Sequence, residues 1–461
     1  DCRLRDFGSA LLRRFIICSA AISARRLNLF PKILIANRGE IAVRVIRACK
    51  EMGVSTVAVF SEADRDALHV SLADESICIG PAPVGQSYLN MDAILSAAIL
   101  TGAKAIHPGY GLLSENAEFA QKCADNGLKF IGPGADIIAR MGDKDAARRT
   151  MREAGVPVVP GCDMVSDAEH AKAEAERIGL PLLIKARSGG GGRGIRLVET
   201  PDQIVRAFDE ARAEARGAFG DDGVYMEKYL TNVKHVEMQL LCDMYGGVVC
   251  LGDRDCSMQR RHQKMIEESP APSISEKTRK KMIEAATKAA HAVNYEGVGT
   301  IEFLVTPDEK FYFMEMNTRL QVEHPVTEMV SGVDLVKWQI RVAAGAELPF
   351  KQSDIKLTGH AIECRINAED PLRNFAPCCG QITLLHIPGG PWVRFDTALY
   401  QGYRIPPYYD SMIGKLIVYA ATRAEAMRKM QAALCEMVIE GVEHTGSLQS
   451  DLINEKAFID G

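Results

Sequence analysis

The stretch Lys185-Ala-Arg-Ser-Gly-Gly-Gly-Gly-Arg-Gly-Ile195 decides how the chain folds. A run this rich in glycine allows a backbone to come close to phosphate. Gly189, Gly191 and Gly194 satisfy the spacing G-x-G-x-x-G, which binds dinucleotides only when it lies between a strand and a helix. A Walker A loop is excluded because no Gly-Lys-Ser/Thr follows at the required spacing.

The residues around this run predict a β-hairpin. Leu182–Lys185 has the pattern of a buried strand, and Ile195–Val198 has the pattern of a second strand, so no helix follows the glycines. Basic residues, Lys185 and Arg193, flank the predicted tip. The hairpin is therefore either a flap that folds over a polyphosphate or a plain surface hairpin.

Length and composition set the outer limits. A chain of 461 residues forms two or three domains. Its net charge of -5 gives no electrostatic reason to expect nucleic acid or an anionic membrane as a partner. The 13 cysteines include no C-x-x-C, and several, such as Cys49, Cys250 and Cys364, lie in apolar segments. This pattern predicts buried thiols in a reducing compartment.

The first thirty residues differ from the rest of the chain. Arg13-Arg14 and Arg25-Arg26 flank an apolar run, Phe15–Ala24, that is typical of an organellar transit peptide or a short signal sequence. That run is too short to cross a bilayer. Asp1 and Asp6 argue against a transit peptide. We therefore treat 1–30 as an extension of unclear origin, for which a cloning remnant is one interpretation. We leave it out of the predicted fold.

The rest of the chain is predicted to form three domains. In 31–158, strand Lys32–Ala36, helix Glu40–Glu51 and strand Thr56–Phe60 make a βαβ unit of a parallel sheet. After a linker, Val156–Pro160, the segment 159–230 contains the glycine hairpin and a helix from Pro201 to Arg216. The segment 231–461 is α+β with a mainly antiparallel sheet. Its predicted elements are strands Val236–Cys242, Gly247–Leu251, Gly299–Val305 and Lys310–Met316, and helix Ser275–Val293.

A polar row gives the strongest chemical signal. Along an extended chain, alternate side chains point to one face. The row comprises Glu315, Asn317, Arg319, Gln321 and Glu323. Glu302 lies among apolar residues on the predicted partner strand, where an unpaired carboxylate is costly. Glu302, Glu315 and Asn317 therefore form a plausible oxygen ligand set for Mg²⁺. The alternative is an exposed sheet face, but Phe311–Met314 is apolar on both faces, as in a covered strand.

Two further segments carry buried or mixed charge. In Asp253–Lys264, basic residues are interleaved with acids, which favours binding of a small anion over nucleic acid. In Glu363–Asp370, Arg365 lies in an otherwise inward-facing segment. From the residues alone, Arg365 is either an ion-pair partner or a catalytic group.

Together these stretches resemble the biotin carboxylases of the ATP-grasp superfamily. The matching motifs, in the family's order, are ILIANRGEIAVRVIRA, IHPGYGLLSEN, MGDK, IKARSGGGGRG, RDCSMQRRHQK, EMNTRLQVEHPVTE, ECRINAEDP and PPYYDSMIGKL. The nearest likeness is to the carboxylase subunit of bacterial acetyl-CoA carboxylase. The resemblance implies an ATP-grasp fold with a Rossmann-like N-terminal domain, a small mobile lid over 159–230 and a C-terminal α+β domain.

The resemblance also implies a reaction, the ATP-dependent carboxylation of biotin by bicarbonate, and a role for each matched residue. The nucleotide contacts are Lys144, Lys185, Gly189, Gly190, Gly191, Gly192, Glu227, Leu230, His235 and His262. Lys264, Arg319 and Gln321 hold bicarbonate, and Glu323 is its base. Glu302, Glu315 and Asn317 bind Mg²⁺ (or Mn²⁺). Tyr110 lines the biotin site, and Arg365 stabilises the biotin enolate.

The implied partners are a biotin carboxyl carrier protein, carboxyltransferase subunits and a second copy of the chain. No Met-Lys-Met attachment site occurs, so the carrier is a separate protein or lies beyond Gly461. We expect a cytoplasmic protein, or one of an organellar matrix if 1–30 is a transit peptide. Alternatives are the corresponding domain of pyruvate or propionyl-CoA carboxylase, another ATP-grasp ligase that joins a carboxylate to an amine, or a nucleotide-binding assembly subunit without turnover.

Overall fold

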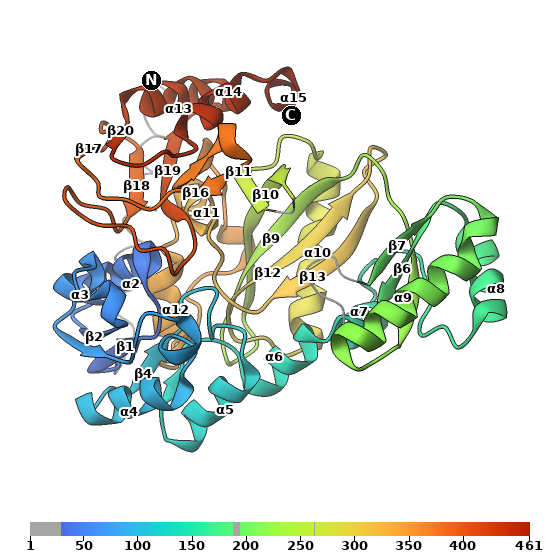
Figure 1. Ribbon diagram of the computed structural model, residues 1–461, viewed down its shortest axis with the longest axis horizontal. Helices are drawn as coiled ribbons and strands as arrows, with labels where there is room; N and C mark the ends of the chain where they lie inside the picture. The colour runs from blue at the N-terminus through green and yellow to red at the C-terminus, as the bar shows by residue number, and fades with distance from the viewer. Residues whose placement is uncertain (1–28, 188–193, 262) are drawn as a thin grey trace, which may run out of the picture.

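The computed structural model describes residues 29–187, 194–261 and 263–461. Three successive parts of the chain build three main sheets, which Figure 1 shows in blue, green and yellow to red. The glycine hairpin and its helices project to one side of the large central sheet in that view. Among the described residues, no helix is both long enough and apolar enough to cross a membrane.

The first sheet is parallel, as the βαβ pattern predicted. Its strand order is β3-β2-β1-β4-β5. The strands are β1 (Lys32–Ile35), β2 (Ser55–Phe60), β3 (Glu75–Cys78), β4 (Ala105–His107) and β5 (Lys129–Phe130). Its helices are α2 (Gly39–Glu51), α3 (Leu68–Leu72), α4 (Met91–Thr101), α5 (Ala117–Asp125) and α6 (Ala135–Gly142). Helix α7 (Lys144–Glu153) then leads to the next part of the chain.

The second sheet confirms the hairpin. Strands β6 (Leu182–Ala186) and β7 (Ile195–Val198) pair antiparallel, with Lys185 opposite Ile195. Strand β8 (Val224–Lys228) pairs with the other edge of β6. Helices α8 (Ala168–Ile178) and α9 (Ile204–Phe219) cover the sheet. The predicted phosphate contacts Gly189, Gly190, Gly191 and Gly192 lie outside the described residues.

The third sheet has eight antiparallel strands in the order β13-β12-β9-β10-β11-β14-β19-β18. The strands are β9 (Lys234–Cys242), β10 (Val248–Arg260), β11 (Gln263–Ser269), β12 (Gly297–Val305), β13 (Phe311–Asn317), β14 (His360–Asn367), β18 (Val393–Thr397) and β19 (Met412–Ala420). Helices α10 (Glu276–Ala292), α11 (His324–Ser331), α12 (Leu335–Ala343), α13 (Arg423–Glu436), α14 (Gly446–Asn454) and α15 (Lys456–Asp460) pack around it. Two small ladders complete this part: β15 (Glu369–Asp370) with β16 (Ala376–Pro377), and β17 (Leu384–His386) with β20 (Val438–Glu440).

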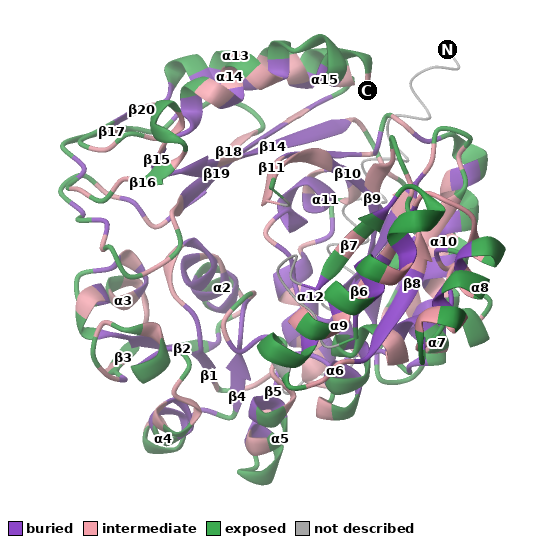
Figure 2. Cartoon of the chain, turned by 45° about the vertical axis from the view of Figure 1, so that its right-hand side comes forward, coloured by how far each residue is buried: buried purple, intermediate pink, exposed green. Residues whose placement is uncertain are grey.

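Helix α2 joins the parallel sheet to the large sheet. Its buried face shares one core with β1, α12 and residues Leu241 and Val249 of the large sheet. Figure 2 shows α2 largely in the colour of buried residues, between the two sheets. Leu29 and Phe30 also pack against this core, so these two residues of the assigned extension belong to the fold. Because this one core contains apolar side chains from both sheets, its burial holds the two parts of the chain against each other.

The largest difference from the sequence prediction is the length of β10. We expected a strand ending at Leu251, but β10 continues through Asp253–Arg260. Polar residues sit inside the sheet there because they are partnered: Arg254 is fully buried among hydrogen-bond acceptors, and Asp253 accepts from Arg279. Periodicity of apolar residues does not detect a strand whose buried side chains are charged and paired. All cysteines within the described residues are free thiols, and Cys49, Cys250 and Cys364 are buried as expected.

Candidate active site

A cavity of about 620 Å³ lies among α7, residues 158–164 and α8, and a larger pocket of about 910 Å³ lies between the first βα turns and the large sheet. The larger pocket brings together all of the predicted catalytic, biotin and metal residues and one predicted nucleotide contact, His235. Those lining it are Tyr110, His235, Lys264, Glu302, Glu315, Asn317, Arg319, Gln321, Glu323 and Arg365. Residues from distant parts of the sequence thus face one space.

The polar row is only partly extended. Strand β13 ends at Asn317, and Glu323 occupies the N-cap position of α11. The prediction of one continuous extended row to Glu323 was therefore wrong. The chain turns because Glu115 accepts hydrogen bonds from the backbone N–H of Thr318 and from Arg319, and because Pro325 favours the first turn of the helix that begins at His324. The side chains of Arg319, Gln321 and Glu323 still line the pocket, but they lie on a turn and not on a strand.

Strand β13 is also less covered than expected. It is the edge strand of the sheet, and Met314 is 45% exposed and lines the pocket. A covered strand was predicted from the apolar residues at 311–314. Here the apolar side chain forms part of a pocket wall, a role that hydrophobicity alone does not separate from core packing.

Lys264 is the centre of the buried charges. Its Nζ donates to Glu237 Oε2 (2.7 Å), Glu302 Oε1 (3.1 Å) and Glu323 Oε1 (2.6 Å). Burial alone would lower the pKa of Lys264, but the surrounding negative charges raise it well above its ordinary value. One ammonium group is therefore shared by three carboxylates and stays charged.

Glu323 is ionised at neutral pH. Its second oxygen accepts from Arg365 Nη2 at 3.0 Å. Burial would raise the pKa of Glu323, but the charges of Lys264, Arg365 and Arg254 outweigh it and hold the pKa well below its usual range. Arg365 in turn donates from Nε to Glu267 Oε1 at 2.6 Å. A carboxylate held between two cations is in the form that can accept a proton.

The proposed metal ligands lie side by side. Glu302 on β12 is directly opposite Glu315 on β13, and Asn317 Nδ2 donates to Glu302 Oε1 at 2.8 Å. Burial and the neighbouring charge of Glu302 raise the pKa of Glu315. The pKa of Glu302 falls to about 2 because Lys264 and His235 outweigh its burial. Two adjacent carboxylates and an amide oxygen fit Mg²⁺, and a dication would relieve the repulsion between them.

The predicted nucleotide contacts divide into two groups. His235 lies in the pocket, 2.8 Å from Glu302 through Nε2. Lys185 Nζ donates to Glu227 Oε2 at 2.6 Å in the hairpin sheet, and Leu230 follows that sheet in the chain. Lys144 is the exposed first residue of α7. Lys144, Lys185, Glu227 and Leu230 do not line the larger pocket. His262 lies outside the described residues.

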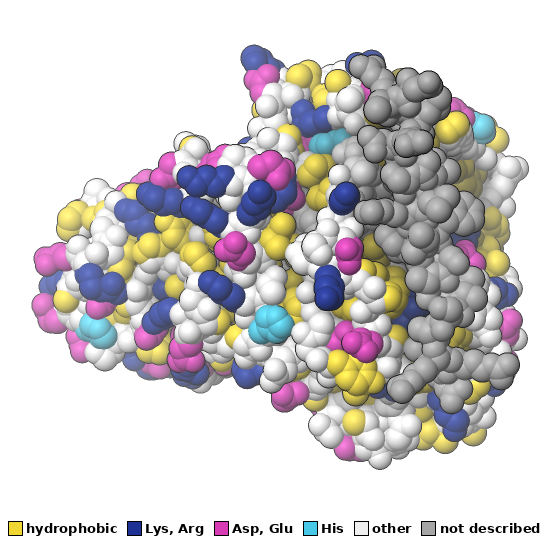
Figure 3. Space-filling model, turned by 180° about the vertical axis from the view of Figure 1, so that it is seen from behind, with side chains coloured by type: hydrophobic (Ala, Val, Ile, Leu, Met, Phe, Trp, Pro, Cys, Tyr) yellow, Lys and Arg dark blue, Asp and Glu magenta, His cyan; other side chains and the backbone are white. Residues whose placement is uncertain are grey.

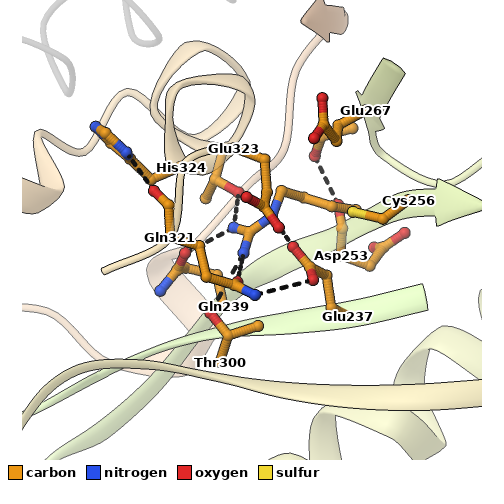
Figure 4. Close-up of polar contacts among 12 residues, drawn as sticks. Glu237, Gln239, Asp253, Cys256, Glu267, Thr300, Gln321, Glu323 and His324 are labelled. Atoms are coloured by element: carbon orange, nitrogen blue, oxygen red, sulfur yellow. Dashed lines mark hydrogen bonds and ion pairs between the residues drawn. The ribbon is translucent and has the colours of Figure 1, made fainter. Parts of the chain in front are cut away.

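Arg254 is a site residue that the sequence analysis did not single out. It is fully buried and donates to Glu237 Oε1 (2.5 Å), Gln239 Oε1 (2.6 Å) and Gln321 Oε1 (2.6 Å), and also to Thr300 and Thr327. Figure 4 shows Glu237, Gln239, Thr300 and Gln321 turned toward a common centre. Arg254 thus fixes the amide of Gln321 and, through Glu237, the ammonium of Lys264. Its position within a mixed run of charges gave no separate signal.

A second group of unpredicted residues lies around Tyr110. The hydroxyl of Tyr110 donates to Glu40 Oε1, and Lys415 Nζ lies 3.1 Å from the same oxygen. Lys415 is fully buried and donates to the carbonyl of Val322 at 2.8 Å, directly before Glu323. These contacts link Tyr110, the predicted biotin residue, to the turn that carries Glu323, the predicted base. Glu40 was predicted only as the first residue of a helix.

Charges elsewhere on the surface are mixed. On the face shown in Figure 3, Lys and Arg side chains alternate with Asp and Glu over the part that is not grey. This face therefore carries charge of both signs.

Family models match nearly the whole chain. The N-terminal domain model of biotin carboxylase matches 29–138, the ATP-binding domain model of the carbamoyl-phosphate synthase L chain matches 143–351, and the C-terminal domain model of biotin carboxylase matches 363–461. Biotin carboxylase 1 of Bacillus subtilis (strain 168) is 55% identical, over 94% of this chain and 97% of its own length. The chloroplastic biotin carboxylase of Arabidopsis thaliana is 54% identical, over 93% of this chain and 80% of its own length.

Solved structures show the same arrangement. A Campylobacter jejuni biotin carboxylase in complex with β,γ-ATP is 52% identical, with a TM-score of 0.89 over 94% of this chain and 96% of that one. The biotin carboxylase domain dimer of Hydrogenobacter thermophilus 2-oxoglutarate carboxylase, with MgADP, ADP and bicarbonate, is 49% identical, with a TM-score of 0.88 over 94% and 96%. With these matches over the pocket and all three sheets, the chain belongs to the biotin carboxylase family of ATP-dependent carboxylating ligases.

Proposed function

We propose that this chain uses ATP to activate bicarbonate as carboxyphosphate and then carboxylates biotin on a carrier protein. The observation that carries the proposal is the placement of Glu323 between Lys264 (2.6 Å) and Arg365 (3.0 Å) at the wall of the pocket. An ionised carboxylate beside two cations suits the activation of bicarbonate. The cations attract the bicarbonate anion, and the carboxylate accepts its proton.

The first step joins bicarbonate to the γ-phosphate of ATP. Lys264, Arg319 and Gln321 hold the bicarbonate, Glu323 takes its proton, and the bicarbonate oxygen attacks phosphorus as ADP leaves. Lys264 must exchange a carboxylate contact for the anion, since its present partners are Glu237, Glu302 and Glu323. Lys144, Lys185 and His235 contact the phosphates, while Glu227 and Leu230 contact the adenine.

Glu302 and Glu315, helped by Asn317, would hold Mg²⁺ (or Mn²⁺). A dication bound there would neutralise charge on the phosphoryl oxygens. Asn317 Oδ1 accepts a hydrogen bond from Arg319 Nη2 at 2.9 Å, so a residue proposed to hold the metal is in direct contact with one proposed to hold bicarbonate.

The second step transfers the carboxyl group. Carboxyphosphate breaks into CO₂ and phosphate, and the phosphate removes the proton from the ureido nitrogen of biotin. That nitrogen then attacks CO₂, while Arg365 stabilises the negative ureido oxygen in the manner of an oxyanion hole. Tyr110, held by Glu40, lines the biotin site. Closure of the glycine hairpin would keep water from the labile intermediate.

We further propose acetyl-CoA as the final acceptor, with a separate biotin carboxyl carrier protein, carboxyltransferase subunits and a second copy of this chain as partners. This choice rests on the resemblance of the motifs to the carboxylase subunit of bacterial acetyl-CoA carboxylase, whereas the 2-oxoglutarate and pyruvate carboxylases among the similar structures support other acceptors. We propose the domain limits 31–158, 159–230 and 231–461, and a cytoplasmic or organellar location.

The test is release of ADP from ATP and Mg²⁺, with and without bicarbonate and free biotin. We expect release that requires bicarbonate and increases with biotin. Consumption of ATP only with an amine and a carboxylate would favour a different ligase. Release that is independent of bicarbonate would contradict the proposal directly.

A further inference from the structure

Arg148 is a buried arginine that the proposed reaction does not use. It lies on α7, one helical turn after Lys144, and only 7% of it is exposed. Its guanidinium forms part of the wall of the 620 Å³ cavity, together with the linker residues 158–164. Residues four apart on a helix share one face. Helix α7 therefore presents Lys144 and Arg148 on the same side, and Arg148 faces the hairpin sheet at Glu227.

The guanidinium of Arg148 holds the linker in place. Nη2 donates to the carbonyl of Val159 (2.9 Å), and Nη1 donates to the carbonyl of Cys162 (3.1 Å). Hydrogen bonds from a charged donor to buried carbonyls are stronger than neutral ones. The segment between these two carbonyls is thus fixed from one side by a single side chain.

The other side of the same linker pairs with β8. Cys162 N donates to the carbonyl of Met226 (2.9 Å), and Lys228 N donates to the carbonyl of Pro160 (2.7 Å), so that Gly161 lies opposite Glu227. The linker is an additional strand between Arg148 and the strand that carries Glu227. Any shift of Arg148 is passed to the backbone of β8 through two hydrogen bonds.

Arg148 also reaches the side chain of Glu227. Its Nη1 lies 3.7 Å from Glu227 Oε1, while Lys185 Nζ donates to Oε2 of the same carboxylate at 2.6 Å. The carboxylate is therefore held between a cation from α7 and a cation from β6. Losing one of the two would let the carboxylate turn toward the other.

Gly161 makes this close approach possible. A Cβ at that position would lie 2.4 Å from Arg148 Nη2 and 2.4 Å from the carbonyl oxygen of Met226. No side chain fits between the guanidinium and β8 without displacing one of them. The packing of Arg148 against the linker thus depends on a glycine at one specific place.

We propose that Arg148 is a positioning residue for ATP, which acts through Glu227 and the linker without touching the nucleotide. The proposal rests on the proposed nucleotide roles of Lys185, Glu227 and Lys144. Because Lys144 and Arg148 share one face of α7, the helix would set the distance between the phosphate end and the adenine end of the bound ATP. A rigid support of this kind lowers the cost of ordering the site on binding.

The test compares R148M with R148K. Initial rates of ADP release are measured with ATP varied at saturating bicarbonate, and then with bicarbonate varied at saturating ATP. Loss of hydrogen bonds to charged groups predicts that R148M raises the KM for ATP about tenfold. The KM for bicarbonate should stay within about twofold, since Lys264 and Arg319 lie in the other pocket. R148K, which keeps the charge and some donors, should recover part of the ATP affinity.

The control is R149M, which changes the next and exposed residue of the same helix. It should match the wild type in both KM values. An unchanged KM for ATP in R148M, or equal rises in both KM values, would overturn the proposal. If R148M does not fold, Mg-ADP titration of R148K by calorimetry decides: weakened binding supports the proposal, and wild-type binding with a lowered Tm refutes it. Failure of the wild type to show bicarbonate-dependent ADP release would refute the proposed function instead.

Discussion

Two buried groups of charges in this protein differ in how their carboxylates are paired. The pocket cluster consists of Glu237, Glu267, Glu302, Glu315, Glu323, Arg254, Lys264 and Arg365. The interdomain cluster consists of Arg44, Glu328, Asp334, Arg394 and Asp396 and joins α2 to α11 and β18. Both are dense networks of ion pairs. None of the members of the interdomain cluster lines the 910 Å³ pocket.

The pKa shifts differ in uniformity between the two clusters. In the interdomain cluster, burial is outweighed by guanidinium groups, which lower the pKa of both Glu328 and Asp396. In the pocket cluster the shifts are split: neighbouring cations lower the pKa of Glu302 and Glu323, whereas burial dominates at Glu267 and Glu315 and raises their pKa values, to about 7 for Glu267. In the interdomain cluster, arginines pair with each carboxylate. In the pocket cluster, three carboxylates share the single ammonium group of Lys264, so that cluster can accept a further cation. Unbalanced buried charge, more than buried charge itself, marks the functional site.

Replacing Glu323, the proposed base in the pocket cluster, should have the largest effect of all the changes, and the effect should be on activity. We expect Glu323→Ala to reduce bicarbonate-dependent ADP release by about 10²–10⁴-fold, because general base catalysis contributes that much. Nucleotide binding, measured by titration with Mg-ADP, should remain close to that of the wild type. Unchanged turnover in the variant would remove Glu323 as the base.

Removing the centre of the pocket network should destabilise the fold. Arg254→Met leaves Glu237 as a buried charge with one fewer cation, and such losses cost about 3–5 kcal/mol of the free energy of unfolding. Denaturant unfolding measures the change. The matched control is Arg206→Met on α9, where the side chain is 84% exposed and the midpoint should not move. Equal midpoints for Arg254→Met and the control would mean that the network does not hold the fold.

The interdomain cluster should tolerate loss of a charge better. In Glu328→Gln, Arg44 keeps Asp334 and Arg394 keeps Asp396, so we expect a cost of about 1.5–3 kcal/mol at pH 7. The lowered pKa of Glu328 stabilises the native state above the ordinary carboxyl value of 4.5, and this stabilisation is lost as the pH falls below it. The difference in stability between wild type and variant should therefore shrink from pH 7 to pH 4. A difference that widens on acidification would contradict the assignment.

The smallest effect is expected at the metal site. Glu315→Gln removes one of two adjacent carboxylates, and we expect the Mg²⁺ concentration for half-maximal ADP release to rise about tenfold. Asp308→Asn, an exposed change in the turn of the same β12–β13 hairpin, serves as the control. An identical Mg²⁺ dependence in Glu315→Gln and wild type would exclude Glu315 as a ligand.

Much of the site was predictable because its residues occur in ordered motifs. Glu302 opposite Glu315 followed from two apolar strands with an acid in each, and the hairpin followed from strand patterns on both sides of the glycines. Arg254, Glu115 and Lys415 were not predicted, because each acts through contacts with residues far away in the sequence. The course of the chain from Asn317 to Glu323 was predicted wrongly, because a side chain from another part of the fold bends it.

The order of elements, the parallel and antiparallel sheets and the chemical types gathered in the motifs could be predicted from the residues alone, because periodicity and glycine placement act locally. Which charges are shared and which are fully paired depends on tertiary packing. Lys264 meets three carboxylates from three different segments, and Arg148 reaches Glu227 across a linker. Protonation and ligand affinity depend on distances between such groups, and those distances are set by how the sheets pack around α2 and the linker.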